Sequence, residues 1–230
     1  MSSQRIRVWF KKGERVRYIS HLDVLRYWER AIRRAELPLS YSQGFTPHPK
    51  LAFAGPLPLG FTAEADVMDV TLDERVDPED FRRRLAPQSS NDLALIAAAE
   101  VPLSNPPPQS VLLWADYRFD VAGLDPADAA SAVAAFLAAT EFPWTEERRE
   151  KAKSYDLRGM VATASVAPID GGTRITCRMR ASQENMARPE QLVAALFPVL
   201  EGQDYCRIGV VLDEVSPARE LYRRKGRFLE

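Results

Sequence analysis

Residues 6–36 decide the fold, and they read IRVWFKKGERVRYISHLDVLRYWERAIRRAE. The segment Ile6–Lys11 alternates apolar side chains with Arg7, Trp9 and Lys11, which is the two-residue period of a half-buried strand. After a turn, apolar residues recur at intervals of three and four, which is the period of an amphipathic helix. The stretch therefore predicts a strand followed by a helix, the opening of a β-α-β arrangement.

The predicted helix runs from His21 to about Glu36, with Ser20 as its N-cap and Pro38 preventing its continuation. Its buried stripe is expected to hold four large apolar residues, namely Leu22, Leu25, Trp28 and Ile32. The opposite face carries four arginines, namely Arg26, Arg30, Arg33 and Arg34. Arginine contacts phosphate and carboxylate groups bidentately, so this face is a candidate for binding a polyanion. The alternative interpretation is a solvated helix face.

Beyond this stretch the chain alternates predicted strands and helices in two similar series. The first series adds strands at 51–54, 67–72 and 93–101 and a helix at 79–85. The second is expected to hold strands at 111–121, 156–167, 174–180 and 207–212 and helices at 126–139 and 189–200. Both read β-α-β-β-α-β, the split βαβ or ferredoxin-like order. We therefore expect an α+β protein of two tandem ferredoxin-like domains, at residues 1–104 and 111–230, joined by a proline-rich linker at 105–110.

Composition excludes several classes of site. The 230 residues include two cysteines, Cys177 and Cys206, which is too few for a disulfide framework, a four-cysteine zinc site or an iron–sulfur cluster held by this chain alone. Neither a Walker A loop nor a Gly-x-Gly-x-x-Gly motif occurs. Acidic residues at 66, 69, 73 and 74 follow a strand period, which favours a solvated strand face over a metal site. We expect no metal and no cofactor.

The net charge of −1 conceals an uneven distribution. Residues 1–60 sum to +7 and residues 219–230 to +3, so the middle of the chain carries −11. This asymmetry indicates an anionic partner at one surface. Residues 1–20 lack the apolar core of a signal peptide, and no apolar run reaches membrane-spanning length, so we expect a cytoplasmic protein without a membrane segment.

Two further segments are candidates for binding. Residues 41–50 read YSQGFTPHPK, and their prolines predict a rigid surface loop, with the alternative that it is purely structural. Its candidate binding residues are Tyr41, Gln43, Phe45, His48 and Lys50. The second candidate is the outward face of the first strand, where arginine beside an aromatic ring suits RNA, unless the two domains' sheets cover that face. Its candidate binding residues are Arg7, Trp9 and Lys11, with Arg17 completing the set.

Several short motifs between Phe10 and Gly60 carry a family resemblance. They are FKKG at 10–13, RYISHLD at 17–23, ERAIRRA at 29–35, LPLSYSQGF at 37–45 and PLPLG at 56–60. Together they resemble the radical-SAM-linked protein family, a bacterial family of unknown function encoded beside, or fused to, a cobalamin-binding-type radical SAM protein. The chain lacks the Cys-x-x-x-Cys-x-x-Cys motif of radical SAM enzymes. The resemblance therefore implies the partner of such an enzyme and not the enzyme itself.

The leading hypothesis is a non-catalytic partner of a radical SAM protein that binds RNA of the rRNA or tRNA class through its basic N-terminal surface. A weaker similarity is to the repeat-processing RNA endonucleases of CRISPR systems, which also pair two ferredoxin-like domains. It gives the alternative of a metal-independent endonuclease with His21, at the helix start, as its base. A histidine that only packs there, and a pure protein–protein adaptor, are the remaining interpretations.

Overall fold

The computed structural model describes residues 3–148, 151–198, 200 and 203–213. The chain divides into two compact units, of which unit 1 comprises Met1–Leu112 with Arg207–Glu230 and unit 2 comprises Leu113–Cys206. The division lies just after the expected linker, and the last strand returns to the first unit, which sequence order alone did not predict. The basic segment 219–230 lies outside the described residues.

Unit 1 is built on a sheet with helices on one face. Its elements are β1 (Gln4–Lys12), α1 (His21–Arg34), β2 (Leu51–Phe53), β3 (Thr62–Leu72), α2 (Pro78–Leu85) and β4 (Leu95–Val101). The strands run in the order β4-β1-β3, β2 pairs with β3, and these pairings are antiparallel. The last strand, β10 (Tyr205–Leu212), lies beside β3. A short 3₁₀ helix, Glu14–Val16, lies between β1 and α1.

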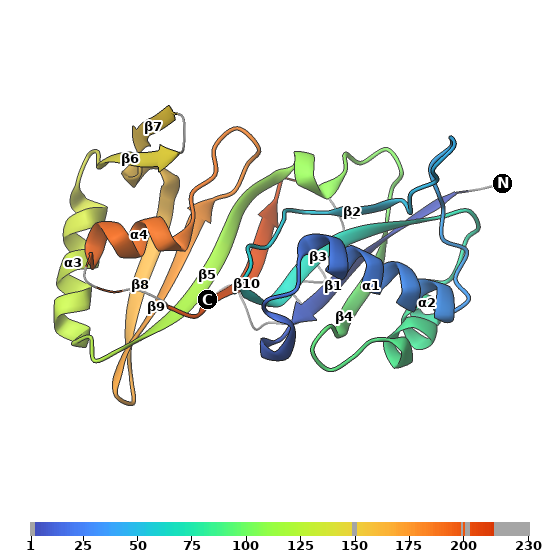
Figure 1. Cartoon of the computed structure of the whole chain (residues 1–230), viewed down its shortest axis with the longest axis horizontal. Helices are drawn as coiled ribbons and strands as arrows, with labels where there is room; N and C mark the ends of the chain where they lie inside the picture. Colours follow the sequence, from blue (N-terminus) through green and yellow to red (C-terminus); the bar gives the residue numbers. More distant parts are fainter. Residues whose placement is uncertain (1–2, 149–150, 199, 201–202, 214–230) are drawn as a thin grey trace. The chain divides into compact units, whose positions relative to one another are not determined.

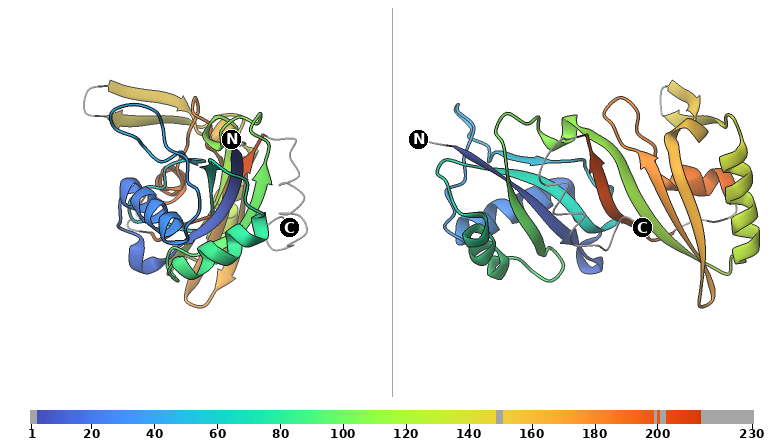
Figure 2. Two further views of the ribbon diagram at one scale, coloured as in Figure 1. Left: turned by 90° about the vertical axis from the view of Figure 1, so that its right-hand side faces the viewer. Right: turned by 180° about the vertical axis from the view of Figure 1, so that it is seen from behind.

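The core of unit 1 lies between this sheet and its two helices. Ile6, Val8 and Phe10 point from β1 into the core, as their alternation predicts, and the Phe10 ring meets Trp28 of α1 edge-on at 5.3 Å. Figure 1 shows α1 and α2 in front of the strands, and the view from behind in Figure 2 shows the strands in front of both helices. The helices cover one face of the sheet because the apolar stripe of each helix packs on the apolar side chains that the strands present to the same side.

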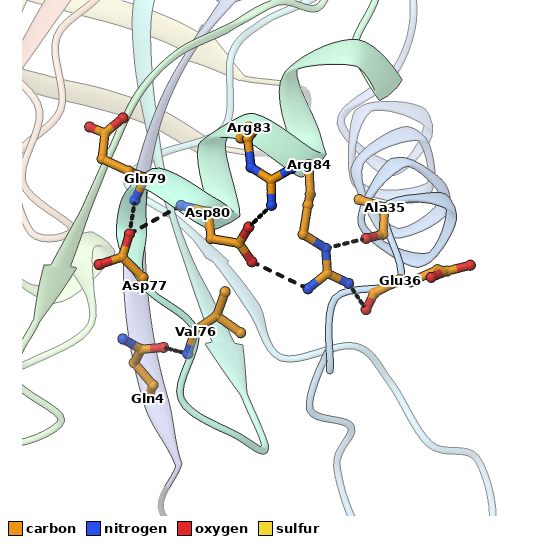
Figure 3. Close-up of polar contacts among 9 residues, drawn as sticks. All are labelled: Gln4, Ala35, Glu36, Val76, Asp77, Glu79, Asp80, Arg83 and Arg84. Carbon is orange, nitrogen blue, oxygen red and sulfur yellow. Dashed lines mark hydrogen bonds and ion pairs between the residues drawn. The ribbon is translucent and has the colours of Figure 1, made fainter.

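The C-terminal end of α1 is fixed by α2, as Figure 3 shows. Arg84 of α2 donates from Nε to the carbonyl oxygen of Ala35 at 3.0 Å and also hydrogen-bonds the carbonyl oxygen of Glu36. A cation at this position satisfies carbonyls that the helix leaves without partners and complements the helix dipole. Glu36 itself has φ 53°, the left-handed conformation that commonly ends a helix and that glycine adopts most easily. Asp77 caps the start of α2 by accepting from backbone N–H groups of its first turn.

Unit 2 also packs helices against antiparallel strands. Its elements are β5 (Leu112–Ala122), α3 (Pro126–Ala138), β6 (Pro143–Arg148), β7 (Lys151–Asp156), β8 (Val161–Ile169), β9 (Gly172–Arg180) and α4 (Pro189–Leu196), followed by the start of β10. β9 lies between β5 and β8. The buried face of β5 holds Ala115, Tyr117, Phe119 and Val121, which confirms the alternation read from the sequence. The hairpin β6-β7 was not predicted, since its residues are highly charged. The chain is an α+β protein with a mostly antiparallel sheet.

Candidate functional site

The four arginines of α1 lie on its solvent face, as the helical period predicts. Arg26, Arg30, Arg33 and Arg34 are all exposed, whereas Trp28, Ala31 and Ile32 are buried on the opposite side. Leu22 differs from the prediction: 60% of its surface is exposed, and Val24 takes its place in the buried stripe. Three of the arginines line a surface groove of about 320 Å³ together with Asp23 and Tyr27, namely Arg26, Arg30 and Arg34.

The charges on this face are only partly compensated. Arg26 lies 3.7 Å from Asp23, a loose exposed pair of the kind that contributes little to stability. Arg34 donates to the side chain of Gln88 at 3.2 Å. Within the described part of the chain, no carboxylate lies at ion-pair distance from Arg30 or Arg33. The face therefore presents at least two guanidinium groups that can contact an external anion.

The loop at residues 41–50 is a closed structure joined to α1. Tyr41 donates its hydroxyl to Glu29 of α1 at 3.1 Å. The loop closes where the Ser42 N–H donates to the His48 carbonyl oxygen at 2.8 Å and the His48 N–H donates to Ser42 Oγ at 2.9 Å. Burial, and next the hydrogen bond to Glu29, raise the pKa of Tyr41 above its usual value. The two ends of the loop are therefore fixed to each other, and one of them is fixed to α1.

The tip of this loop is open to solvent. Gln43, Phe45, His48 and Lys50 are exposed, and the Phe45 ring is fully exposed. Gly44 has φ 127°, a conformation that L-residues other than glycine rarely adopt, so this glycine is what allows the turn. An exposed aromatic ring and an exposed lysine in one loop offer stacking together with charge.

The strand face that we expected to be open is buried at Arg7 and Trp9. Arg7 has 1% of its surface exposed, and its guanidinium donates to both carboxylate oxygens of Asp69, at 2.7 and 3.0 Å. Trp9 packs in a small apolar cluster with Ala54 and Val67. The structure therefore does not bring these two residues to a surface, because buried cross-strand partners occupy them. Lys11 on the same strand is exposed.

A cluster of charged side chains that sequence reasoning did not assemble lies beneath the start of α1. Lys12 and Asp66 are buried with Arg207, and Arg207 donates to Asp66 Oδ2 at 2.5 Å. Lys12 donates from Nζ to the Arg17 carbonyl oxygen at 2.8 Å, while Arg17 donates from Nε to the Gly60 carbonyl oxygen at 3.0 Å. One signal was present in the sequence, because Lys12 has the same strand parity as the buried residues 6, 8 and 10.

His21 closes one side of this cluster. Lys12, His21 and Asp66 line one narrow pocket, whose apolar wall includes Phe10 and Phe53. The imidazole meets the Phe53 ring edge-on at 4.8 Å, and burial lowers the pKa of His21. Burial also lowers the pKa of Lys12, and the Asp66 carboxylate opposes that change. The His21 imidazole and the Lys12 side chain thus line the same small pocket.

Unit 2 has a polar sheet face of its own. Arg174 chelates Asp120 with two bonds of 2.7 Å, and Arg178 chelates Asp116 at 2.7 and 2.8 Å, in both cases across directly paired residues of β5 and β9. The hydrogen bond to Asp116, and next the negative charge of that carboxylate, raise the pKa of the Arg178 guanidinium above its usual value. These two arginines are each matched by a carboxylate. Arg118 and Arg180 lie on the same face, and the Arg180 guanidinium lies 4.7 Å from the centre of the Trp114 ring.

No metal site is assembled in the part of the chain that the structure describes, since its His, Cys, Asp and Glu side chains form no group of three or more able to hold an ion. Asp66 and Asp69 point to opposite faces of β3 and each binds an arginine. Burial raises the pKa of the Cys177 thiol. Among the described helices, none combines the length and apolarity needed to cross a membrane.

Comparison with known proteins gives a family but no reaction. The chain belongs to the family described as "Uncharacterized protein conserved in bacteria (DUF2344)", which matches residues 5–189. No curated protein matches it. Among solved structures it is similar to the crystal structure of an unknown protein from Galdieria sulphuraria, with 16% identity over 92% of this chain and 100% of that chain, at a TM-score of 0.29. That likeness is too low to support an argument.

Proposed function

We propose that this protein is a non-catalytic binding partner that recognises RNA through the exposed surface of α1 and the loop at residues 41–50. The observation that carries the proposal is the arginine face of α1, on which Arg30 and Arg33 have no carboxylate partner among the described residues. RNA backbones are bound by such guanidinium groups, and bases that are not paired stack on exposed aromatic rings such as Phe45.

Binding is tested with radiolabelled total RNA and a charge-neutralised variant. We expect R26Q/R30Q/R33Q to bind at least about tenfold more weakly than the wild type at low salt, because three phosphate contacts are lost. The matched control is R75Q/R82Q/R83Q, which removes three exposed arginines of the same unit that are already paired with Glu100, Glu79 and Asp80. Equal losses in both variants, or no binding by the wild type, would contradict RNA recognition by α1.

The second half of the proposal is that the partner protein is a radical SAM enzyme. It rests on the resemblance of residues 10–60 to the radical-SAM-linked family and on the lack of a cluster-binding cysteine motif in this chain. Affinity purification of the tagged chain from its native lysate tests it. Recovery of a protein that carries the three-cysteine radical SAM motif supports the proposal, and its consistent absence from the purified material counts against it.

We also propose that each series of elements is a ferredoxin-like domain. In unit 1, β1 lies between β3 and β4, β2 pairs with β3, and α1 and α2 lie on one face, which supports a split βαβ arrangement. In unit 2, β9 lies between β5 and β8, and α3 and α4 follow β5 and β9 in the chain. The hairpin β6-β7 is then an insertion between the first helix and the second strand of that domain.

A second candidate function is a metal-independent RNA endonuclease. It is favoured by the pocket that holds His21 next to Lys12, because a neutral imidazole can accept a proton and an ammonium can stabilise the anionic transition state. Incubation of RNA in EDTA with the wild type and His21→Ala tests it. Cleavage that the variant lacks would favour the enzyme, and intact RNA with both proteins would remove it.

A further inference from the structure

Lys12 is a buried cation that the fold leaves incompletely paired. Its side chain lies at the end of β1 with 2% of the residue exposed. An ammonium has three N–H donors, and the Lys12 ammonium makes one hydrogen bond, to the Arg17 carbonyl oxygen. Within the described residues no carboxylate lies at ion-pair distance from its Nζ. Burying an ammonium in this way is costly unless an anion joins it.

Asp66, the carboxylate that lines the same pocket, is bound to other groups. Its Oδ2 accepts from Arg207 at 2.5 Å and its Oδ1 accepts from the Val67 N–H at 2.9 Å. Arg207 also donates to the Gly55 carbonyl oxygen at 3.0 Å, which fixes the guanidinium on Asp66. Because Asp66 and Arg207 neutralise each other, the positive charge of Lys12 remains as the net charge of the pocket.

Exposed aromatic and apolar residues are the chain neighbours of residues that line the pocket, since Tyr18 precedes Ile19 and Leu22 follows His21. Its cavity volume is about 10 Å³, the space of one water-sized group, so one oxygen atom can enter while the rest of a ligand stays at the mouth. Tyr18, three residues before His21, is 74% exposed, and the Arg17 guanidinium lies 5.2 Å from the centre of its ring. An aromatic ring with a cation beside it is a surface on which a nucleobase can stack.

We propose that this pocket is an oxyanion site for the terminal phosphate of an RNA strand, with Lys12 binding a phosphate oxygen and Tyr18 stacking on the terminal base. A pocket that holds a single oxygen-sized group suits a group that ends a chain, whereas an internal phosphodiester continues on both sides. His21 lines the pocket and donates or accepts a hydrogen bond according to its protonation. The site rests on the RNA-binding function proposed above and specifies the part of the RNA that is read.

The test compares oligonucleotides that differ only at their ends. One RNA sequence is prepared with a phosphate or a hydroxyl at its 5′ end, and likewise at its 3′ end, and its affinity is measured for the wild type. We expect about tenfold tighter binding of one phosphate-ended form, the size of a single charge-assisted hydrogen bond to a buried group. Lys12→Met, which keeps the apolar stem of the side chain, is expected to bind phosphate and hydroxyl ends equally.

Matched variants and a second probe keep the outcomes separate. Lys11→Met removes the exposed lysine that precedes Lys12, and we expect this variant to keep the preference for the phosphate end. We expect Tyr18→Ala to bind both the phosphate-ended and the hydroxyl-ended RNA more weakly. RNA binding without any end preference overturns the terminal-phosphate site and leaves the proposed function standing. If no RNA binds at all, the site is tested by comparing the shift in melting temperature that adenosine 5′-monophosphate and adenosine cause. A larger shift with the monophosphate that is lost in Lys12→Met supports the site. If no such shift occurs, the site is overturned.

Discussion

Arg7 and Asp69 lie directly opposite each other on β1 and β3, and both are almost completely buried. Two bonds of 2.7 and 3.0 Å join them. A buried ion pair contributes less to stability than its geometry implies, because both groups lose their hydration. Loss of one partner is different, since it leaves a charge without compensation in the interior.

This asymmetry gives the first stability prediction. Arg7→Met should reduce the free energy of unfolding by about 3–5 kcal/mol, because Asp69 then stays buried without its cation. The double variant R7M/D69L should recover most of that loss, since neither charge remains. Urea denaturation of the two variants and the wild type measures both effects. A double variant as unstable as the single one would show that the pair is needed for packing and not for charge balance.

Glu36 affects stability through its backbone conformation more than through its side chain. It ends α1 with φ 53°, where a side chain costs energy that glycine avoids. Glu36→Gly is expected to raise the free energy of unfolding by about 1 kcal/mol. Arg30→Gly, inside the same helix, is the control and should lower it by about 1 kcal/mol. Thermal unfolding of both variants checks the opposite signs, and a destabilised Glu36→Gly would contradict the role given to that conformation.

At the scale of elements, the start of α1 makes stability depend on pH. Burial lowers the pKa of His21 below its ordinary value of 6.5. Between the folded-state pKa and 6.5, the unfolded chain therefore binds more protons, and stability is lost as the pH falls through this window. His21→Gln should flatten that dependence, whereas His48→Gln, in the exposed loop, should keep it. Denaturation midpoints measured between about pH 5 and pH 7 test this, and a wild-type protein that gains stability on acidification there would contradict it.

The same helix shows what the sequence could and could not predict. Its start and its arginine face followed from Ser20, Pro38 and the 3.6-residue period. Leu22 was assigned to the buried stripe although it lies six residues before Trp28, a third of a turn away, whereas Val24 lies close to one full turn before it. The hairpin β6-β7 was missed for another reason, since charged residues hide the strand period.

The buried cluster could not be predicted, because its members come from distant parts of the chain. Lys12, His21, Asp66 and Arg207 lie on β1, α1, β3 and β10, and only the sheet order brings them together. Strand parity places Lys12 on the buried face, but it does not reveal which groups meet it there. The exposure of Arg7 was mispredicted for the same reason, since its partner Asp69 is 62 residues away.

At the scale of the whole molecule, the near-zero net charge divides into a basic N-terminal segment and an acidic middle. In unit 1, Arg30 and Arg33 of α1 have no carboxylate at ion-pair distance among the described residues, while on the polar sheet face of unit 2 Arg174 and Arg178 each chelate a carboxylate. Arg174 and Arg178 are therefore already neutralised, whereas Arg30 and Arg33 can take an external anion. We propose that RNA binds to unit 1 through the α1 arginines.

The salt dependence of RNA binding tests this claim most directly. Each phosphate contact to single-stranded RNA adds about 0.7 to the slope of log affinity against log salt concentration. We expect R26Q/R30Q/R33Q to lower the magnitude of this slope by about 2 relative to the wild type, and R75Q/R82Q/R83Q to leave it within experimental error. An unchanged slope in R26Q/R30Q/R33Q, or an equal loss in both variants, would contradict it.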